Sequence, residues 1–450
     1  MLTSKIQNSN IQKDRKGASQ SWRERIISAQ EAAGMVKSGQ RVFLTGNCST
    51  PIEFLKALVA RYEEVQNVEV VQLLGLGPGD YITEEMAEHI RINSLFIAPN
   101  LRKPISKGLA DFTPVLLSEI PKLFTSGRLI LDIAVIQVSP PDVHGFCSYG
   151  VEVGVSKTAA ETAGVVIAEI NPNMPRTLGD SFIHVDKINY FIEVDYQLPE
   201  LQPPAPDPIQ DKIAAHIAEL IPDGATLQLG IGGIPDAVLR RLTNHANLGV
   251  HTELFSDGVM DMIEKGVINN AMKSIHPGKV VAGFVLGTRK LYDYIHDNPI
   301  FEIHPTAYVN DPFVIAQNYK MVSINSALEV DITGQICADS IGTMFYSGAG
   351  GQLDFVRGAA RSEGGMTFIA LPSTAKNDTI SRIVPQLKPG AGVVTTRYDV
   401  HFVATEYGVA DLWGRKISER VHALVNIAHP DFREDLLRYA REQNYIGGVF

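Results

Sequence analysis

The residue of this chain with the clearest capacity for chemistry is Glu253, a carboxylate placed where a short strand meets a turn. Residues 249–252 have the composition of a strand, and residues 254–258 have that of the turn leaving it. The working groups of an open parallel sheet collect at the carboxyl ends of its strands. A carboxylate at that edge can meet a ligand and attack it as a nucleophile. The structural alternative for a single loop acid is a solvated or helix-capping side chain.

Two glycine-rich turns favour the chemical interpretation of Glu253. The first contains Gly230, Gly232 and Gly233 between a predicted strand and a predicted helix, and the second spans residues 347–352. A turn of this kind directs backbone N–H groups at an anion or a developing oxyanion. Either turn alone could serve chain geometry only. Together with a strand-end carboxylate, they predict a site that stabilises negative charge.

The first turn also resembles a dinucleotide-binding fingerprint. Gly230 and Gly232 follow a strand, and an acid lies 23 residues beyond Gly230. However, Pro235 replaces the third glycine of the fingerprint, and the other glycine run, residues 75–79, contains a proline and no clear helix start behind it. An oxidoreductase is therefore disfavoured.

An internal duplication sets Glu253 apart from the rest of the chain. Three anchors align in the same order: residues 45–51 with 229–235, 142–147 with 331–337, and 164–172 with 365–373. Ordered anchors about half a chain apart predict two similar domains rather than a short-period solenoid. Extending the first anchor to the next strand places Glu253 opposite roughly Leu73, so only the second copy has an acid there.

Composition limits the classes of function. The 450 residues suffice for two or three domains. The chain has 40 Lys and Arg against 50 Asp and Glu, a net charge of −10, and no concentrated basic stretch, so a nucleic-acid partner is not expected. Cys48, Cys147 and Cys337 lie far apart, which fits small core residues in a reducing compartment. Neither cysteines nor histidines show metal-ligand spacing, so we predict no metal.

Domain boundaries follow from proline and hydrophobic patterning. Residues 198–210 are rich in proline and form the predicted linker. Residues 23–197 should form an amino-terminal α/β domain and residues 211–450 a carboxyl-terminal catalytic α/β domain. Each half alternates helices with strands, which predicts two similar, open, largely parallel α/β sheets covered on both faces. Their large apolar faces also suggest a homodimer or higher homo-oligomer.

The sequence lacks the signals of membrane insertion and secretion. No run approaches the roughly 20 apolar residues that a membrane span requires. Residues 1–22 are polar, carry mixed charge and lack the apolar middle of a signal peptide. We expect a cytoplasmic protein with no membrane association, whose residues 1–22 form a loose leader or surface strap.

A colinear series of motifs extends from about Ile27 to Leu437. The most specific are residues 227–238, 251–258, 339–343, 347–358, 405–410 and 428–432. The series resembles the family I CoA-transferases of the acetyl-CoA hydrolase/transferase group, most closely the 4-hydroxybutyrate CoA-transferase branch. The resemblance implies that Glu253 is the nucleophile. Attack on an acyl-CoA thioester would give an acyl-glutamyl anhydride, and the released CoA thiolate would then give a glutamyl-CoA thioester.

The resemblance also implies roles for the two turns. Backbone amides of Gly230, Gly232 and Gly233, and of Gly350 and Gly351, would stabilise the oxyanions, at about 3 kcal/mol per donor. Gln228 would line the site. Contacts to CoA would come from Ser347, Gly348, Gly350, Gly351 and Gln352. Coenzyme A would be substrate and product, with no tightly bound cofactor.

Other charged residues are weaker candidates. Glu363 and Glu406 are competing carboxylates, and Asp339 and Asp354 read as structural acids in or beside loops. Two arginines four residues apart, Arg357 and Arg361, could neutralise CoA phosphates or lie on a solvated or ion-paired face.

Three functions remain open at this point. A CoA-transferase would pass the acyl-enzyme to a carboxylate, an acyl-CoA hydrolase would pass it to water, and a non-catalytic acyl-CoA-binding protein would do neither. Residues 47–50 and 74–80 depart from the branch pattern and are expected to shape the acyl pocket. The acids considered are therefore 4-hydroxybutyrate, butyrate, acetate, succinate and itaconate.

Overall fold

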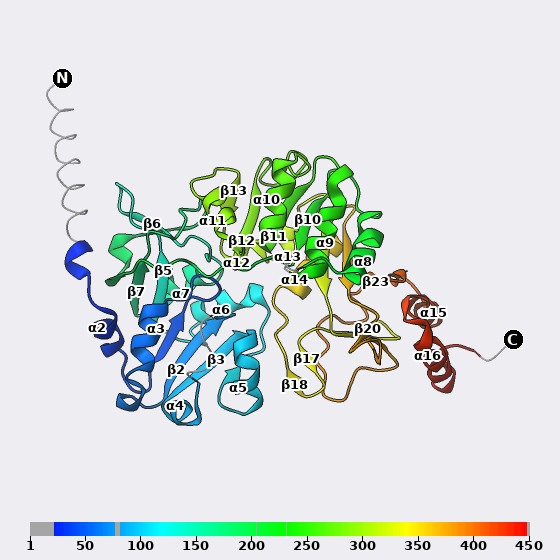
Figure 1. Cartoon of the computed structure of the whole chain (residues 1–450), viewed down its shortest axis with the longest axis horizontal. Coiled ribbons are helices and arrows are strands. Elements are labelled where there is room, and N and C mark those ends of the chain that lie inside the picture. Colours follow the sequence, from blue (N-terminus) through cyan, green and yellow to red (C-terminus); the bar gives the residue numbers. More distant parts are fainter. Residues whose placement is uncertain (1–21, 77–81, 204, 231, 448–450) are drawn as a thin grey trace, which may run out of the picture. The chain divides into compact units, whose positions relative to one another are not determined.

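The structure is a computed structural model that describes residues 22–76, 82–203, 205–230 and 232–447 (Figure 1). The chain divides into two compact units. Unit 1 comprises Met1–Thr113, Ile120–Glu200 and Tyr292–Pro305, and unit 2 comprises Pro114–Glu119, Leu201–Leu291 and Thr306–Phe450. The predicted leader, residues 1–22, lies outside the described residues except for Trp22, whose side chain is buried.

Unit 1 is built on a seven-stranded sheet in which neighbouring strands pair in parallel. The strand order is β4 (Asp111–Phe112), β3 (Ile90–Phe96), β2 (Val68–Leu73), β1 (Arg41–Leu44), β5 (Ile133–Val138), β7 (Val165–Ile170) and β9 (Tyr190–Glu193). Its helices include α2 (Ala29–Gly34), α3 (Ile52–Val59), α4 (Glu84–His89), α5 (Arg102–Ser106), α6 (Ile120–Thr125) and α7 (Ser156–Thr162). A capping box between Ser28 and Glu31 begins α2, since each side chain accepts a backbone N–H that the helix leaves unpaired.

Unit 2 repeats this architecture. Its main strands follow the order β12 (Val280–Val285), β11 (Gly249–Phe255), β10 (Thr226–Leu229), β14 (Met321–Ser326), β19 (Met366–Ala370), β23 (Phe402–Thr405) and β24 (Gly408–Asp411). The pairing of β23 with β24 is antiparallel, and the other described pairings are parallel. Its helices are α8 (Pro208–Ala218), α9 (Gly233–Arg241), α10 (Asp257–Glu264), α12 (Thr306–Val309), α13 (Pro312–Ile315), α14 (Gln352–Arg361), α15 (Ile417–Ile427) and α16 (Pro430–Glu442).

Short strands complete both units. Unit 1 has the antiparallel pair β6 (Phe146–Ser148) and β8 (Phe182–His184). Unit 2 has a small sheet of β16 (Ile336–Cys337), β15 (Glu329–Asp331) and β22 (Ile383–Val384), and the hairpins β17 (Ser340–Ile341) with β18 (Met344–Phe345) and β20 (Thr374–Ala375) with β21 (Ile380–Ser381).

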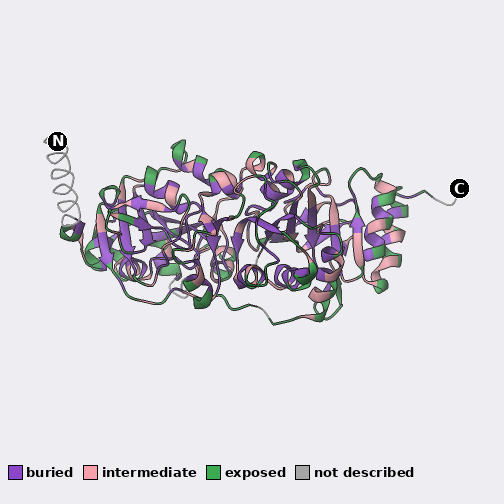
Figure 2. Cartoon of the chain, turned by 90° about the horizontal axis from the view of Figure 1, so that it is seen from above, coloured by how far each residue is buried: buried purple, intermediate pink, exposed green. Residues whose placement is uncertain are grey.

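The strands form the core of each unit. Every residue of β5 and of β12 is buried, as expected for parallel strands whose two faces are both covered. Figure 2 shows buried residues concentrated along the strands and exposed residues on the outer helices. The cysteines Cys48, Cys147 and Cys337 are free and buried, which confirms that they are core residues. Among the described helices, none is long and apolar enough to cross a membrane.

Strand topology confirms the predicted fold class and agrees with the internal duplication. The order β3-β2-β1-β5-β7-β9 in unit 1 corresponds to β12-β11-β10-β14-β19-β23 in unit 2. The second sequence anchor has the same local geometry in both copies. Asp142 accepts the backbone N–H groups of His144 and Phe146, and Asp331 accepts those of Thr333 and Gln335. Each carboxylate thereby fixes the turn that follows it.

The ladders also refine the position that matches Glu253. Strand β1 pairs Val42 with Val70, and β10 pairs Thr226 with Gly249. With the first anchor aligned, Glu253 corresponds to Leu74, one residue beyond the predicted Leu73. Both leucines are aliphatic, so only unit 2 has an acid at this position.

The two compact units exchange two segments of the chain, whereas the predicted domains, residues 23–197 and 211–450, are contiguous. Pro114–Glu119 belongs to unit 2, where the Leu117 N–H donates to the Gly350 carbonyl oxygen over 3.0 Å. Tyr292–Pro305, with the end of α11 (Arg289–Ile295) and with β13 (Phe301–Ile303), belongs to unit 1. There the Ile303 N–H donates to the Leu178 carbonyl oxygen over 2.7 Å.

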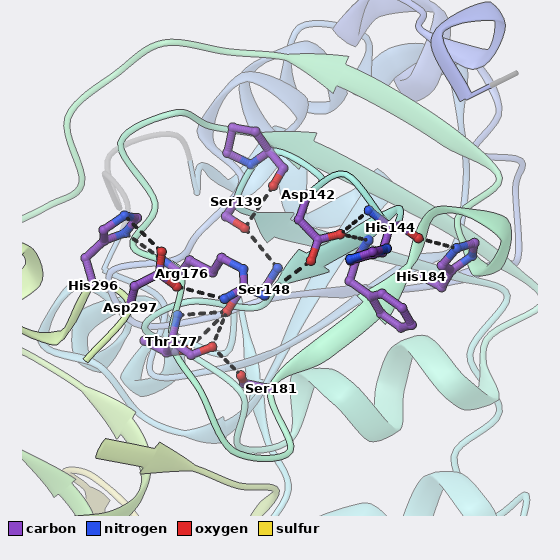
Figure 3. A network of polar contacts seen from close by, with 12 residues as sticks. Ser139, Asp142, His144, Ser148, Arg176, Thr177, Ser181, His184, His296 and Asp297 are labelled. Carbon is purple, nitrogen blue, oxygen red and sulfur yellow. Dashed lines mark hydrogen bonds and ion pairs between the residues drawn. The ribbon is translucent and has the colours of Figure 1, made fainter. Parts of the chain in front are cut away.

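A polar network attaches this second segment to unit 1 (Figure 3). The guanidinium of Arg176 donates to Asp297 over 2.7 Å and to Asp142 over 3.2 Å, and the Arg176 N–H donates to the His296 ring over 3.0 Å. Asp142 is the anchor residue that also fixes its own turn. The exchange therefore depends on side chains more than 100 residues apart, which local patterning does not reveal.

The predicted linker, residues 198–210, overlaps a helix. Helix α8 begins at Pro208, and Asp207 accepts the Gln210 N–H over 2.9 Å as its cap. Proline is tolerated at the first helical position because that N–H would have no partner within the helix.

Candidate active site

Glu253 lies near the carboxyl end of β11, on a strand whose other residues are buried. The strand continues to Phe255, so Glu253 lies within it and not, as expected, where the strand meets the turn. Side chains alternate along a strand, so Glu253 shares a face with His251. The His251 ring contacts the Val309 carbonyl oxygen over 2.9 Å, which places this face against α12. Glu253 itself keeps partial exposure.

Two N–H donors hold the Glu253 carboxylate. The amide nitrogen of Asn310, the residue that follows α12, lies 3.1 Å from Glu253 Oε2. The backbone N–H of Gly351, which caps the N-terminus of α14, donates to the same carboxylate. Asn310 is fully buried, so its amide has no competing contact with solvent. This pair of donors defines the candidate site.

Position 351 requires glycine because of close approach. A Cβ there would lie well under 3.0 Å from Glu253 Oε2 and from Asn310 Nδ2. The backbone angles of Gly351, φ −93° and ψ 7°, are accessible to other residues. The contact with Glu253, and not backbone conformation, therefore excludes a side chain.

The environment makes the Glu253 carboxylate a stronger base than an ordinary glutamate. Burial raises the pKa of its carboxyl group to about 7, and the charge of Asp354 contributes to the increase. The hydrogen bonds from Asn310 and Gly351 oppose this shift because they stabilise the ionised form. The carboxylate consequently changes protonation state near pH 7 and is partly ionised there. An ionised carboxylate with restricted solvation is suited to nucleophilic attack.

Asp354 is a second buried carboxylate of the site, in the first turn of α14. It accepts the hydroxyl of Ser118 over 2.8 Å and the Ser118 N–H over 3.1 Å. Burial raises the pKa of Asp354 to about 6, and hydrogen bonds from Ser118 and Asn310 moderate the increase. The sequence pattern predicted Asp354 only as a structural acid and gave no signal for Ser118 or Asn310. Asn310 has no motif of its own and lies 57 residues from Glu253.

Gln228 lies on β10, and its side-chain amide is hydrogen-bonded to residues of β14, a neighbouring strand of the sheet. Its Oε1 accepts the Ser323 hydroxyl over 2.7 Å and the Asn325 amide over 3.1 Å. Thr252, the neighbour of Glu253, donates its hydroxyl to the Leu229 carbonyl oxygen over 3.0 Å. The structure thus places Gln228 on the strand beside β11, where its side chain is hydrogen-bonded to polar side chains of β14. A role in lining the acyl site stays a prediction.

The first glycine turn connects β10 to α9. Gly232 has φ 113°, a conformation that disfavours any side chain, and Gly233 packs against Gln210 too closely for a Cβ. Gly230, the residue after β10, has no such constraint. These contacts explain two of the three glycines by chain geometry. The oxyanion role predicted for their amides is not needed to explain them and stays a prediction.

The second turn contributes one direct contact to Glu253, through Gly351. Ser347 donates its hydroxyl to the Ala338 carbonyl oxygen over 3.2 Å, and the Gln352 amide donates to the Ser326 carbonyl oxygen over 3.2 Å. Gly350 has φ 54°, and Gly348 is buried. These contacts shape the turn, and the predicted CoA contacts of residues 347–352 are expectations about a ligand.

The remaining candidates have other environments. Glu363 is exposed after α14, and Glu406 accepts the Ser373 hydroxyl over 2.6 Å. Arg357 forms an ion pair with Asp399 at 3.1 Å, in agreement with the ion-paired alternative. Of the carboxylates in the described part of the chain that were considered as nucleophiles, Glu253 is the one bound by Asn310 and Gly351.

Comparisons with known proteins agree with these features. Residues 9–199 match the family described as acetyl-CoA hydrolase/transferase N-terminal domain, and residues 287–440 match the corresponding C-terminal domain. The 4-hydroxybutyrate coenzyme A transferase of Clostridium kluyveri is 49% identical over 416 residues, covering 92% of this chain and 97% of the relative. The succinyl-CoA:acetate/propanoyl-CoA:succinate CoA transferase of Fasciola hepatica is 49% identical, covering 92% and 87%.

Solved structures and more distant relatives extend the comparison. The crystal structure of 4-hydroxybutyrate CoA-transferase from Porphyromonas gingivalis has a TM-score of 0.82 and 42% identity, and it covers 94% of this chain and 99% of that one. An acetyl-CoA hydrolase of Kluyveromyces lactis is 28% identical, covering 94% of this chain and 90% of the relative. The similarity thus includes both transferases and a hydrolase.

Proposed function

The chain belongs to the acetyl-CoA hydrolase/transferase family and is a CoA-transferase, and on this premise we propose that Glu253 is the nucleophile that moves CoA between small carboxylic acids. The observation that carries the proposal is a carboxylate near the carboxyl end of β11 that is held by two N–H donors, Asn310 and Gly351. Its pKa of about 7 leaves it substantially ionised at neutral pH. Of the competing carboxylates, Glu363 is exposed and Glu406 is bound by Ser373.

The first half-reaction exchanges a thioester for an anhydride. One oxygen of Glu253 attacks the acyl-CoA carbonyl carbon, the C–S bond breaks, and CoA leaves as the thiolate. The product is an acyl-glutamyl anhydride. The thiolate then attacks the Glu253 carboxyl carbon and expels the donor acid as its carboxylate, which leaves a glutamyl-CoA thioester. An acceptor carboxylate completes the transfer by the same steps in reverse order, so no ATP is consumed.

The two donors suit the step in which Glu253 itself is attacked. Asn310 donates to Oε2 of Glu253, and Gly351 packs against that same oxygen. When the thiolate adds to the carboxyl carbon, Oε2 becomes the oxyanion of the tetrahedral intermediate, already facing both donors. Oε1 is left to make the bond to the acyl group. Donors fixed where charge develops are typically worth about 3 kcal/mol each.

The proposed substrates are small acyl-CoAs and small carboxylates, namely 4-hydroxybutyrate, butyrate, acetate, succinate or itaconate. The similarity to 4-hydroxybutyrate and succinate transferases supports this range. CoA is proposed to act only as substrate and product, without a resident cofactor or metal. Hydrolysis of the same acyl-enzyme is the second candidate, favoured by the similarity to an acetyl-CoA hydrolase. Dependence of CoA release on an added acceptor carboxylate distinguishes transfer from hydrolysis.

Mass spectrometry of the intact protein tests the nucleophile. The enzyme would be incubated with acetyl-CoA or butyryl-CoA, trapped with borohydride or hydroxylamine and mapped by peptide. We expect an adduct on Glu253 in wild type and in Glu363→Gln, a matched control for an exposed acid, and no adduct in Glu253→Gln. An adduct that survives Glu253→Gln, or none in wild type across several acyl-CoAs, would contradict the proposal.

A further inference from the structure

Asn325 belongs to a row of polar side chains on β10 and β14, and the acyl transfer described above assigns it no role. Gln228 Oε1 accepts the Ser323 hydroxyl over 2.7 Å and the Asn325 amide over 3.1 Å. The Asn325 amide also donates to the Ser323 oxygen over 2.9 Å. Gln228 and Ser323 are buried, whereas Asn325 is partly exposed. Asn325 is therefore the member of this row that a ligand can reach.

The fold does not require polar residues at these positions. With the first anchor aligned, Gln228 of unit 2 corresponds to Leu44 of unit 1. Strand β10 pairs Gln228 with Ser323, whereas β1 pairs Leu44 with Val135. Leu44 and Val135 are both buried, so an aliphatic pair fills the same place in the sheet of unit 1. The polar pair is specific to unit 2, which is the unit that contains Glu253.

The polar row lies where the strand order of unit 2 reverses. Strands β11 and β12 lie on one side of β10, and β14 and β19 lie on the other. Ligands of open α/β sheets bind at such a point, outside the carboxyl ends of the strands. Gln228 is the third of the four residues of β10, and Asn325 is the fifth of the six residues of β14. Both side chains therefore lie at the end of the sheet where a ligand is expected.

The strand ladders align Asn325 with Glu253 across one intervening strand. Strand β10 pairs in parallel with β11 on one side and with β14 on the other. Continuing these two ladders to the end of β10 places Gly230 level with Glu253 on β11 and with Asn325 on β14. Side chains at the same level of neighbouring parallel strands lie on the same face of the sheet. Glu253 and Asn325 thus share a face, two strand spacings or roughly 10 Å apart.

Gly230 leaves the space between these two side chains open. Its φ lies outside the left-handed region, so backbone conformation does not require glycine there. An added Cβ would meet the Pro235 Cγ at 3.8 Å, which is an ordinary van der Waals contact, and no other described atom within 4 Å beyond its chain neighbours. The space beside the Glu253 carboxylate can therefore hold part of a substrate.

An acyl group of four carbons attached to Glu253 has the length to reach Asn325. A four-carbon chain with a terminal hydroxyl extends roughly 6 Å from the glutamyl oxygen. A hydrogen bond from that hydroxyl adds about 2.8 Å, and the total is close to the separation of the two residues. An acetyl group extends less than half as far, so it would not reach Asn325.

The Asn325 side chain offers this acyl group an uncharged acceptor. Its two amide hydrogens are directed at Gln228 and Ser323. Its Oδ1 accepts a long contact of 3.4 Å from Gln228 Nε2, and a carbonyl oxygen has a second lone pair. A hydroxyl can donate to that lone pair, whereas an ionised carboxylate has no hydrogen to donate. The row therefore favours an acyl group that ends in a hydroxyl.

We propose that Asn325 is a specificity-determining residue whose Oδ1 accepts a hydrogen bond from the terminal hydroxyl of a four-carbon acyl group lying over Gly230. The inference rests on the proposed role of Glu253 as the nucleophile. Gln228 and Ser323 orient the Asn325 amide, which explains why this part of the sheet is polar in unit 2. A purely structural row of hydrogen bonds is the alternative to be tested.

The preference of the enzyme for acceptor acids separates the two roles. With acetyl-CoA as the donor, kcat/KM would be measured for 4-hydroxybutyrate, 3-hydroxybutyrate and butyrate. Wild type should prefer 4-hydroxybutyrate to butyrate about tenfold, and 3-hydroxybutyrate should behave like butyrate because its hydroxyl ends short of Asn325. Asn325→Ala should lower kcat/KM for 4-hydroxybutyrate about tenfold and change that for butyrate less than about twofold. A structural role would lower both values equally.

Thr367→Val is the matched control. Thr367 lies on β19, pairs with Ser323 and is buried, and its hydroxyl has no hydrogen-bond partner among the described residues. The substitution thus changes a polar side chain of the same face, one strand farther from Glu253, and should leave the acceptor preference unchanged. If Asn325→Ala does not fold, as judged by thermal unfolding, Asn325→Leu gives the same comparison with the side-chain volume kept.

Gly230→Ala tests the place of the acyl chain independently of the polar row. Its methyl group would occupy the space proposed for the middle of the chain, without a clash in the free protein. We expect kcat/KM for 4-hydroxybutyrate and butyrate to fall about tenfold or more, while exchange of labelled acetate into acetyl-CoA changes less than about twofold. An equal loss for acetate would overturn the proposed place of the acyl chain.

The outcomes separate this inference from the proposed function. If wild type forms the Glu253 adduct but shows no preference for 4-hydroxybutyrate, or if Asn325→Ala leaves that preference unchanged, the role of Asn325 is overturned and the function stands. A preference for succinate that Asn325→Ala removes would overturn the assignment of a hydroxyl. Absence of the Glu253 adduct in wild type would overturn the proposed function and this inference together.

Discussion

Replacing Gly351 by alanine is expected to lower kcat about 10²–10³-fold while the protein stays folded. A Cβ at this position would lie well under 3.0 Å from Glu253 Oε2 and 3.3 Å from the Glu253 carboxyl carbon. Real Cβ atoms almost never lie within 3.0 Å of another heavy atom, so Oε2 and with it the carboxylate must shift by roughly 1 Å. The Asn310 nitrogen and Oε2 are already 3.1 Å apart, and a further 1 Å exceeds hydrogen-bond range.

The magnitude follows from the loss of one oxyanion donor. Such a loss typically raises the activation free energy by about 2.7–4 kcal/mol. A misplacement of about 1 Å has a similar effect on a reaction that depends on orientation. Stability should fall by only about 1 kcal/mol, because φ −93° and ψ 7° suit alanine, although glycine is a better N-cap residue than alanine.

Steady-state CoA transfer, thermal unfolding and trapping of the Glu253 adduct would be measured in parallel. Gly34→Ala is the matched control, since a Cβ there meets no atom within 4 Å. The control should retain wild-type kcat. A Gly351→Ala variant that transfers CoA at the wild-type rate, or one whose loss of activity is matched by loss of folded protein, would refute this role of Gly351.

The other predictions concern acidity, hydrogen bonding and charge. The pKa of Glu253 is raised to about 7, and its ionised form is the nucleophile. The value of kcat/KM, measured across pH 5–9, should therefore rise with pH, reach half of its plateau near pH 7 and level off above it. A midpoint near pH 4.5 would contradict this prediction. Asn310→Ala should lower kcat about 10²-fold with a small change in acyl-CoA binding, as measured by kcat and KM separately. Burial raises the pKa of Glu169 in the folded protein from 4.5 to about 7, so the folded state binds more protons at this group than the unfolded state does. The contribution of Glu169 to the free energy of unfolding is therefore complete below about pH 4.5 and is lost as the pH rises through 7. Thermal unfolding of Glu169→Gln should lack that decline, and an unchanged pH dependence would exclude the assignment. The substitution Arg357→Gln should lower the free energy of unfolding by less than about 1 kcal/mol and leave the KM for CoA substrates unchanged, because the Arg357 side chain is half-exposed and already paired with Asp399. A several-fold rise in KM would instead indicate that Arg357 binds CoA phosphates.

Local patterns in the sequence were sufficient to predict the fold class and the central residue. The alternation of helices with apolar strands predicted parallel sheets, and the anchors around Asp142 and Asp331 predicted a duplication that the matching turns support. Glu253 was identified because its counterpart in the other half is aliphatic. Such features depend on composition and spacing within about ten residues, or on comparison of two copies, and both can be read along the chain.

Only the tertiary structure assembled the environment of Glu253. Asn310 has no distinctive neighbours in sequence, Asp354 resembles any helix-start acid, and Ser118 comes from the first half of the chain although it binds α14 of unit 2. Gly351 was predicted as an oxyanion donor, but its contact with Glu253 explains why a side chain is excluded. Ser118 reaches α14 because the segment Pro114–Glu119 belongs to unit 2, and the other residues come from distant parts of unit 2's own sequence. Contacts between residues tens to hundreds of positions apart depend on the path of the backbone and on side-chain packing at the end of β11. The hydrophobic periodicity of the sequence predicts neither of these.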